Sequence, residues 1–252
     1  MSQIVSVHSF RGGTGKSNTT ANISALLAAK GLRVCAIDTD INSPGIHVLF
    51  GLKEEETGLT LNDFLWERCD IEEAAYDMTA RMDIQGDGKL YLVPSSVKAA
   101  DITRILRDGY DVGLLNDGFQ DLIEMLDLDV LMIDTHPGLN EETLLSIAIS
   151  DTLLLIMRPD QQDIQGTGVT IDVARKLKVP NLTLIVNKAP TIYNFAEMQA
   201  DMEETFDCTV GAILPHSDEL MILASKGIFA LHYPDHAIAK SLQVVADSLA
   251  AE

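Results

Sequence analysis

A glycine-rich stretch ahead of a lysine and a serine is the part of the sequence best suited to bind phosphate. Its glycines allow a tight turn in which several backbone N–H groups face one anion at the start of a helix. Lys16 adds a positive charge for phosphate oxygens, and the hydroxyl of Ser17 suits Mg²⁺. We therefore predict a phosphate-binding loop formed by Gly12, Gly13, Thr14, Gly15, Lys16, Ser17 and Asn18.

The spacing of this loop departs from that of ordinary phosphate-binding loops, whose first glycine would stand at position 10. Phe10 occupies that position. The alternative interpretation is a glycine-rich turn of a dinucleotide-binding unit. Gly15-Lys16-Ser17 lies between an apolar strand and an Ala/Leu-rich helix, and this context favours phosphate binding.

Carboxylates follow two other apolar runs. Asp38 and Asp40 come after Leu32–Ile37, and Asp134 comes after Val130–Ile133. Ligands of open α/β sheets bind beyond the carboxyl ends of the strands, so these side chains are expected near the loop. The alternative is that Asp38 caps its own loop and Asp40 is solvated. His136 lacks partners for a metal and is expected to be loop structure.

These residues need strands that end side by side. Short Val-, Ile- and Leu-rich runs alternate with helical patterns, which is typical of a parallel sheet covered on both faces. We predict an α/β fold with a mostly parallel, doubly wound sheet flanked by helices. Its predicted strands are Ile4–Val7, Leu32–Ile37, Leu90–Val93, Val130–Ile133, Leu153–Met157 and Leu182–Val186, and its first helix is Thr19–Lys30.

The chain has 252 residues, of which 46% are hydrophobic, and this is enough for a full core. The order of the motifs favours one domain spanning residues 1–252. The segment 53–89 is acidic and punctuated by glycines. We expect this less regular insertion to add small helices at an edge of the sheet.

The formal charge is −20, with 38 acidic and 18 basic residues. Such a charge opposes broad attraction to DNA or anionic lipid. Cys35, Cys69 and Cys208 lack metal-ligand spacing and are expected to be reduced thiols. No signal-type leader and no run of about 18 apolar residues is present. We therefore expect a cytoplasmic protein.

The segment Phe10–Ser17 resembles the deviant Walker A box of the ParA/MinD ATPases, whose usual form is Lys-Gly-Gly-x-Gly-Lys-Thr/Ser. The resemblance implies a P-loop ATPase that uses ATP and Mg²⁺. Arg11 stands where that family has the signature lysine, which crosses a nucleotide-sandwich dimer to the partner's phosphates. Arginine keeps the charge but is not interchangeable with lysine. Arg158, after Leu153–Met157, is a second candidate for this role; the alternative is a surface arginine paired with Asp160 or Asp163.

The same resemblance implies roles for the acidic residues. Asp38-Thr39-Asp40 resembles the family's switch I, in which Asp40 would orient the attacking water and Asp38 would lie near the magnesium shell; the reverse assignment stays open. Asp134 matches the Walker B position, where it would act with Ser17 around Mg²⁺. Pro137-Gly138 resembles the mobile switch II. The implied catalytic set is Lys16, Asp38, Asp40 and Arg11, and the implied metal set is Ser17, Asp38 and Asp134.

Two later segments resemble the family's base-binding parts. Asn187-Lys188 would pair with adenine and cover an apolar surface, although a turn entering a helix explains the pair equally well. Residues 211–218 resemble the strand and loop that close over the base, which places Pro215 and Asp218 there.

Members of the family that this sequence resembles act as ATP-gated dimers that bind nucleoid DNA or membrane and respond to an adaptor protein. We expect no membrane anchoring, because Lys240 is the one basic residue of the amphipathic C-terminal segment 235–250. Non-specific nucleoid DNA is a candidate partner through two basic groups, and the altered signature position suggests a branch that positions cargo such as carboxysomes. The alternative is a nucleotide-switched scaffold that binds a protein client directly. The basic groups are Lys98, Arg104 and Arg107, and Arg175, Lys176 and Lys178.

Overall fold

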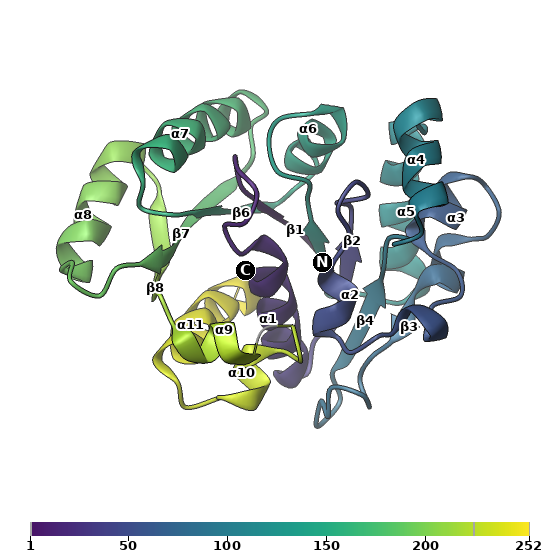
Figure 1. Cartoon of the computed structure of the whole chain (residues 1–252), viewed down its shortest axis with the longest axis horizontal. Helices are drawn as coiled ribbons and strands as arrows, with labels where there is room; N and C mark the ends of the chain where they lie inside the picture. The colour runs from purple at the N-terminus through teal and green to yellow at the C-terminus, as the bar shows by residue number, and fades with distance from the viewer. Residues whose placement is uncertain (1, 224, 252) are drawn as a thin grey trace.

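The computed structural model describes residues 2–223 and 225–251, and within them one eight-stranded sheet forms the centre of the molecule (Figure 1). The strand order is β3-β4-β2-β5-β1-β6-β7-β8, and all neighbours are parallel except β3 and β4. This confirms the predicted fold class. The strands are β1 (Gln3–His8), β2 (Arg33–Asp38), β3 (Tyr76–Asp77), β4 (Lys89–Val93), β5 (Val130–Asp134), β6 (Thr152–Met157), β7 (Asn181–Ala189) and β8 (Thr209–Pro215).

Helices cover both faces of the sheet (Figure 1). One face carries α1 (Lys16–Ala29), α10 (Phe229–His232) and α11 (Ala237–Ala250), and the other carries α5 (Val112–Met125), α6 (Glu141–Ala148), α7 (Gln161–Lys176) and α8 (Phe195–Phe206). Shorter or peripheral helices are α2 (Ile46–Leu49), α3 (Leu61–Leu65), α4 (Ala99–Asp108) and α9 (Asp218–Leu223).

Alternate strand residues enter different cores, because successive side chains of a strand point to opposite faces. Val5 and Val7 of β1 pack with α1 and α11, whereas Ile4 packs with the core under α5. Val34 and Ile37 of β2 divide in the same way. The central strands are thus buried on both sides, as their nearly continuous apolar sequence predicts.

The segment 53–89 forms small elements at the sheet edge. These are the 3₁₀ helices η1 (Glu54–Glu56) and η2 (Ile71–Ala74), α3, and the two-residue antiparallel strand β3. Predicted strands lie within the observed ones apart from Leu32, which precedes β2, and the first helix begins at Lys16, three residues before the predicted start. Among the described residues, no helix is long and apolar enough to span a bilayer.

The register of the sheet brings three motifs together. β5 lies between β1 and β2, and Asp134 at its end is opposite Val7 of β1 and Asp38 of β2. The loop after β1 therefore lies beside the carboxylates that end β2 and β5.

Candidate functional site

The glycine loop connects β1 to α1. Gly13 and Gly15 have φ angles of 75° and 107°, which side chains rarely adopt. A Cβ atom on Gly15 would also collide with the amide of Asn187. Glycine is therefore required at position 15 both by the backbone conformation and by the close approach of β7. Lys16, Ser17 and Asn18 form the first turn of α1, where backbone N–H groups lack helical partners.

Lys16 is buried, with 7% of its surface exposed. None of the described acidic side chains lies within 4 Å of its ammonium group. Buried lysines are normally paired, since an unpaired buried charge is unfavourable. The ammonium group is therefore placed for an anion supplied by a ligand.

Asp134 lies at the end of β5 and is buried. Burial raises its pKa to about 6, while a hydrogen bond from Ser17, the charge of Lys16 and a hydrogen bond from Thr20 oppose the rise. Thr20 Oγ1 lies 3.3 Å from Asp134 Oδ1. A hydrogen bond from Ser17 thus contributes to the pKa of Asp134, and the joint role of the two residues around Mg²⁺ stays a prediction.

Asp38 is fully buried and caps the loop that follows β2. Its two carboxylate oxygens accept hydrogen bonds from the main-chain N–H groups of Asp40 and Gly45, each at 3.1 Å. Burial, together with the neighbouring charge of Asp134, raises the pKa of Asp38. The capping interpretation of Asp38 therefore holds, and its role in a magnesium shell stays a prediction.

Asp40 lies nearer the surface and faces the loop after β5. Its carboxylate accepts a hydrogen bond from the main-chain N–H of Ser43 at 3.2 Å, and His136 Nε2 lies 3.9 Å from Asp40 Oδ1. Burial raises the pKa of Asp40, and the charges of His136 and Lys16 oppose this rise. His136 does occupy a loop, as predicted, but its contact with Asp40 was not foreseen.

Sequence reasoning also missed His8, the last residue of β1. Its Nδ1 lies 2.8 Å from Thr135 Oγ1, and that hydroxyl donates to the carbonyl of Val7 at 3.0 Å. When the hydroxyl donates to Val7 in this way, Nδ1 carries the proton of a neutral imidazole. Burial and the charge of Lys16 lower the pKa of His8 to about 3. A polar residue ending an apolar strand was the available signal for this residue.

Asn187 and Lys188 contact the glycine loop from β7. Asn187 Nδ2 donates to the carbonyl of Thr14 at 2.7 Å, and Lys188 Nζ donates to the carbonyl of Gly13 at 2.9 Å. Both residues are thus beside the phosphate loop, where they orient its carbonyl groups. Their predicted contact with adenine stays a prediction.

A cavity of about 430 Å³ adjoins the loop on its β7–β8 side. Its lining includes Asn18, Asn187, Lys188 and Pro215, together with apolar side chains of α9 and α11. Asp218 does not line this cavity; its side chain is largely exposed and lies 3.8 Å from His216. The cavity is large enough for a nucleoside, and three of the four predicted base-site residues, Asn187, Lys188 and Pro215, border it.

The two arginine candidates for a charge offered to a partner lie together. Arg11 Nη1 is 3.2 Å from Asp163 and 3.5 Å from Asp160, and Arg158 pairs with the same two carboxylates. The alternative considered for Arg158, pairing with Asp160 or Asp163, is therefore observed. Gly12 lies in the same part of the loop, without a close contact at its Cβ position.

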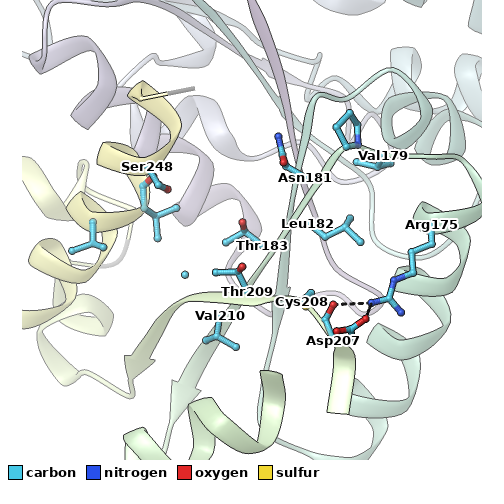
Figure 2. A pocket seen from close by; sticks show the side chains of 14 residues that line it. Arg175, Val179, Asn181, Leu182, Thr183, Asp207, Cys208, Thr209, Val210 and Ser248 are labelled. Atoms are coloured by element: carbon cyan, nitrogen blue, oxygen red, sulfur yellow. Dashed lines mark hydrogen bonds and ion pairs between the residues drawn. The ribbon is translucent and has the colours of Figure 1, made fainter. Parts of the chain in front are cut away.

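A second cavity, of about 650 Å³, is not part of this site. It lies at the amino ends of β7 and β8, the opposite edge of the sheet (Figure 2). Arg175 lines this cavity (Figure 2); its guanidinium donates to the carbonyl oxygens of Phe206 and Asp207 and pairs with the Asp207 carboxylate at 3.6 Å. Arg104 is likewise engaged, with its guanidinium 4.3 Å from the centre of the Trp66 ring.

The site's oxygen ligands fit Mg²⁺. Among the described residues, no group of three or more His, Cys, Asp or Glu side chains could hold a metal ion. Mg²⁺ commonly binds one or two carboxylates, waters and substrate phosphates, and it does not need such a group. The hydroxyl of Ser17 beside the carboxylate of Asp134 is a donor pair of this kind.

Comparison with known proteins agrees with this geometry. The AAA_31 family model, described as an AAA domain, matches residues 2–185. An uncharacterised ATP-binding protein of Methanocaldococcus jannaschii is 26% identical over 250 residues, covering 99% of this chain and 88% of that protein.

Two solved structures are similar in fold. The septum site-determining protein MinD of Pyrococcus horikoshii, complexed with Mg-ADP, has a TM-score of 0.80 and 22% identity, covering 99% of this chain and 96% of that chain. A complex of a Cyanothece McdA variant with ATP has a TM-score of 0.75 and 18% identity, covering 98% and 96%. The chain belongs to the AAA_31 family and is a P-loop ATPase of the ParA/MinD type.

Proposed function

We propose that this protein binds ATP with Mg²⁺, pairs as an ATP-dependent homodimer, and hydrolyses ATP slowly until an adaptor protein stimulates it. The dimer would position a protein cargo over the nucleoid, with carboxysomes as the cargo suggested by the altered signature position. The observation that carries the proposal is Lys16, a buried ammonium group without an acidic partner among the described residues, where the glycine loop ends and α1 begins.

Each residue of the site has a role in this proposal. The loop N–H groups and Lys16 would bind phosphate oxygens, and the cavity beside Asn187 would receive the base. Ser17 and Asp134, with Asp38, would hold Mg²⁺, which when bound neutralises phosphate charge. Asp40 would orient the attacking water, since it is the least buried of the three carboxylates.

The test is the light-scattering mass of the protein and of Asp40→Ala with ATP, with ADP and without nucleotide. We expect a dimer with ATP alone, and a more persistent dimer for Asp40→Ala. A monomer under all three conditions would contradict the sandwich mechanism.

A second candidate is a switch that binds a protein client without DNA or membrane. The state of the basic residues supports it, because Arg175 and Arg104 are already engaged within the chain and the net charge is −20. Retention of the ATP-bound dimer on DNA separates the two candidates. Retention lost in Arg175→Glu or Arg104→Glu supports nucleoid positioning, and no retention of the unmodified dimer supports the client switch.

A further inference from the structure

Arg11 and Arg158 share one buried carboxylate. Arg11 Nη1 lies 3.2 Å from Asp163 Oδ1, and Arg158 Nε lies 3.0 Å from Asp163 Oδ2. The Asp163 side chain is 2% exposed, whereas that of Arg11 is 39% exposed. Asp160 at the start of α7 also contacts both guanidinium groups, at 3.5 Å and 3.3 Å. The arginine at the signature position is therefore held within its own chain.

The sharing is unequal. Asp163 accepts one hydrogen bond from Arg11 but three from Arg158, through its main-chain N at 3.0 Å, Nε at 3.0 Å and Nη2 at 3.4 Å. Burial alone would raise the pKa of Asp163, but the hydrogen bonds from Arg158 hold it below its ordinary value. Asp163 is thus ionised, and the charge of Arg158 balances its negative charge even when Arg11 is not in contact.

Phe10, the residue before Arg11, also packs against α7. The ring of Phe10 lies against the bare backbone of Gly166 in α7, where a Cβ atom would collide with it. Phe10 and Arg11 therefore both rest on the first turns of α7, one by packing and one by charge.

We propose that Arg158 is a positioning residue that keeps Arg11 releasable, because it neutralises Asp163 and lets Arg11 leave for a phosphate of a second chain's nucleotide. The proposal rests on the ATP-dependent dimer proposed above. Removing one partner of a buried ion pair is strongly unfavourable when the other charge is left alone. Arg158 prevents that outcome when Arg11 departs.

Arg158→Gln removes the competing cation. Arg11 then becomes the one strong partner of Asp163 among the described residues, so its departure would leave a buried carboxylate without a cation. We expect this variant to bind ATP as a monomer but to dimerise more weakly. Arg158→Lys keeps the charge and is the matched control.

The first measurement concerns the nucleotide-free chain and needs no dimer. The rate at which phenylglyoxal modifies Arg11 is followed by mass spectrometry of its peptide, which does not include Arg158. We expect Arg158→Gln to slow modification of Arg11 by roughly fivefold, and Asp163→Asn to accelerate it, because ion pairing protects the guanidinium. An unchanged rate in Arg158→Gln overturns the inference.

The second measurement is ATP-dependent dimerisation by light scattering. Asp163→Asn combined with Arg158→Gln removes the buried carboxylate that retains Arg11 and leaves only the longer contact with the exposed Asp160, so we expect it to restore the dimer. No restoration would mean that Arg158 itself reaches the partner, and it would overturn the positioning role. A shifted Arg11 rate combined with a wild-type chain that never dimerises would instead contradict the proposed function.

Discussion

Asn187 Nδ2 donates a hydrogen bond to the carbonyl of Thr14, 2.7 Å away and 173 residues earlier in the chain. Lys188 holds the preceding carbonyl, that of Gly13. The N–H of a planar trans peptide points opposite to its carbonyl. Holding these two carbonyls toward β7 therefore directs the N–H groups of Thr14 and Gly15 to the other side, where phosphate would bind.

Replacing Asn187 by Ala should weaken nucleotide binding by releasing the Thr14 carbonyl. A hydrogen bond contributes about 0.5–1.5 kcal/mol, so we expect a loss of roughly 2- to 13-fold. Calorimetric titration with ATP and with GTP separates the two roles of this residue. An equal loss for both nucleotides indicates loop positioning, a loss confined to ATP indicates adenine pairing, and unchanged binding of both contradicts either role.

Asp40→Asn and Asp38→Asn should separate the two carboxylates of the β2 loop. We expect Asp40→Asn to lower the ATP hydrolysis rate by about 100-fold or more while the ATP-bound dimer persists, because a residue that positions or deprotonates water contributes about that much. Asp38→Asn should loosen the loop, since Asp38 caps it through Asp40 and Gly45. Hydrolysis rates and urea unfolding of both variants are the measurements. An Asp40→Asn variant that hydrolyses ATP normally would assign the water to Asp38.

His8 should make the protein less stable in mild acid. The folded-state pKa of about 3 lies below the ordinary value of 6.5, so the unfolded state binds one more proton between these pH values. The contribution of neutral His8 to the free energy of unfolding is fully present above pH 6.5. It is lost as pH falls, with a slope of up to about 1.4 kcal/mol per pH unit. His8→Asn keeps a donor for Thr135 but does not titrate. Urea unfolding at pH 7 and pH 5 should show a smaller loss of stability for this variant than for the unmodified chain.

Much of the fold follows from local sequence. The apolar runs that end in Asp38 and Asp134 indicate buried parallel strands, and Gly-Lys-Ser after the first run places the phosphate loop. The order in which strands pair also explains why carboxylates 96 positions apart in sequence meet. Short elements were not predictable in the same way, because the two residues of β3 carry no periodicity of their own.

The contacts that determine the roles of individual site residues could not be predicted from local sequence. Arg11 pairs with Asp163, 152 positions away in the sequence, and no local sequence pattern predicts this ion pair. The contact of His136 with Asp40 likewise depends on how two loops converge. Burial of His8 and the engagement of Arg175 by main-chain carbonyls are tertiary effects that composition does not encode.

Gly166→Ala should disturb the docking of Phe10. A Cβ atom at position 166 would meet the Phe10 ring, whereas one at Gly168 in the same helix would meet its nearest neighbour, Phe206, at 3.7 Å. We expect Gly166→Ala to lower the free energy of unfolding by about 1 kcal/mol and Gly168→Ala to raise it by about 0.5 kcal/mol, since alanine favours helix. Urea unfolding of the two variants is the comparison. Equal stabilisation of both would show that Phe10 does not rest on Gly166.

The C-terminal helix should behave as part of the core. Val245 is 1% exposed and its neighbour Val244 is 61% exposed. Val245→Ala should lower the free energy of unfolding by about 2 kcal/mol, because two buried methyl groups are lost. Val244→Ala is the control and should change it little. Similar effects of the two substitutions would contradict the packing of α11 against the sheet.

The phosphate loop lies near the start of the chain, yet its supports come from far along it. The carbonyl of Thr14 is hydrogen-bonded by Asn187, and α1 is covered by α11, which begins at position 237. Contacts between distant segments form late, because closing long loops is entropically unfavourable. During synthesis on the ribosome, the loop would therefore lack these contacts until most of the chain had emerged. Nucleotide would then bind only as folding is completed.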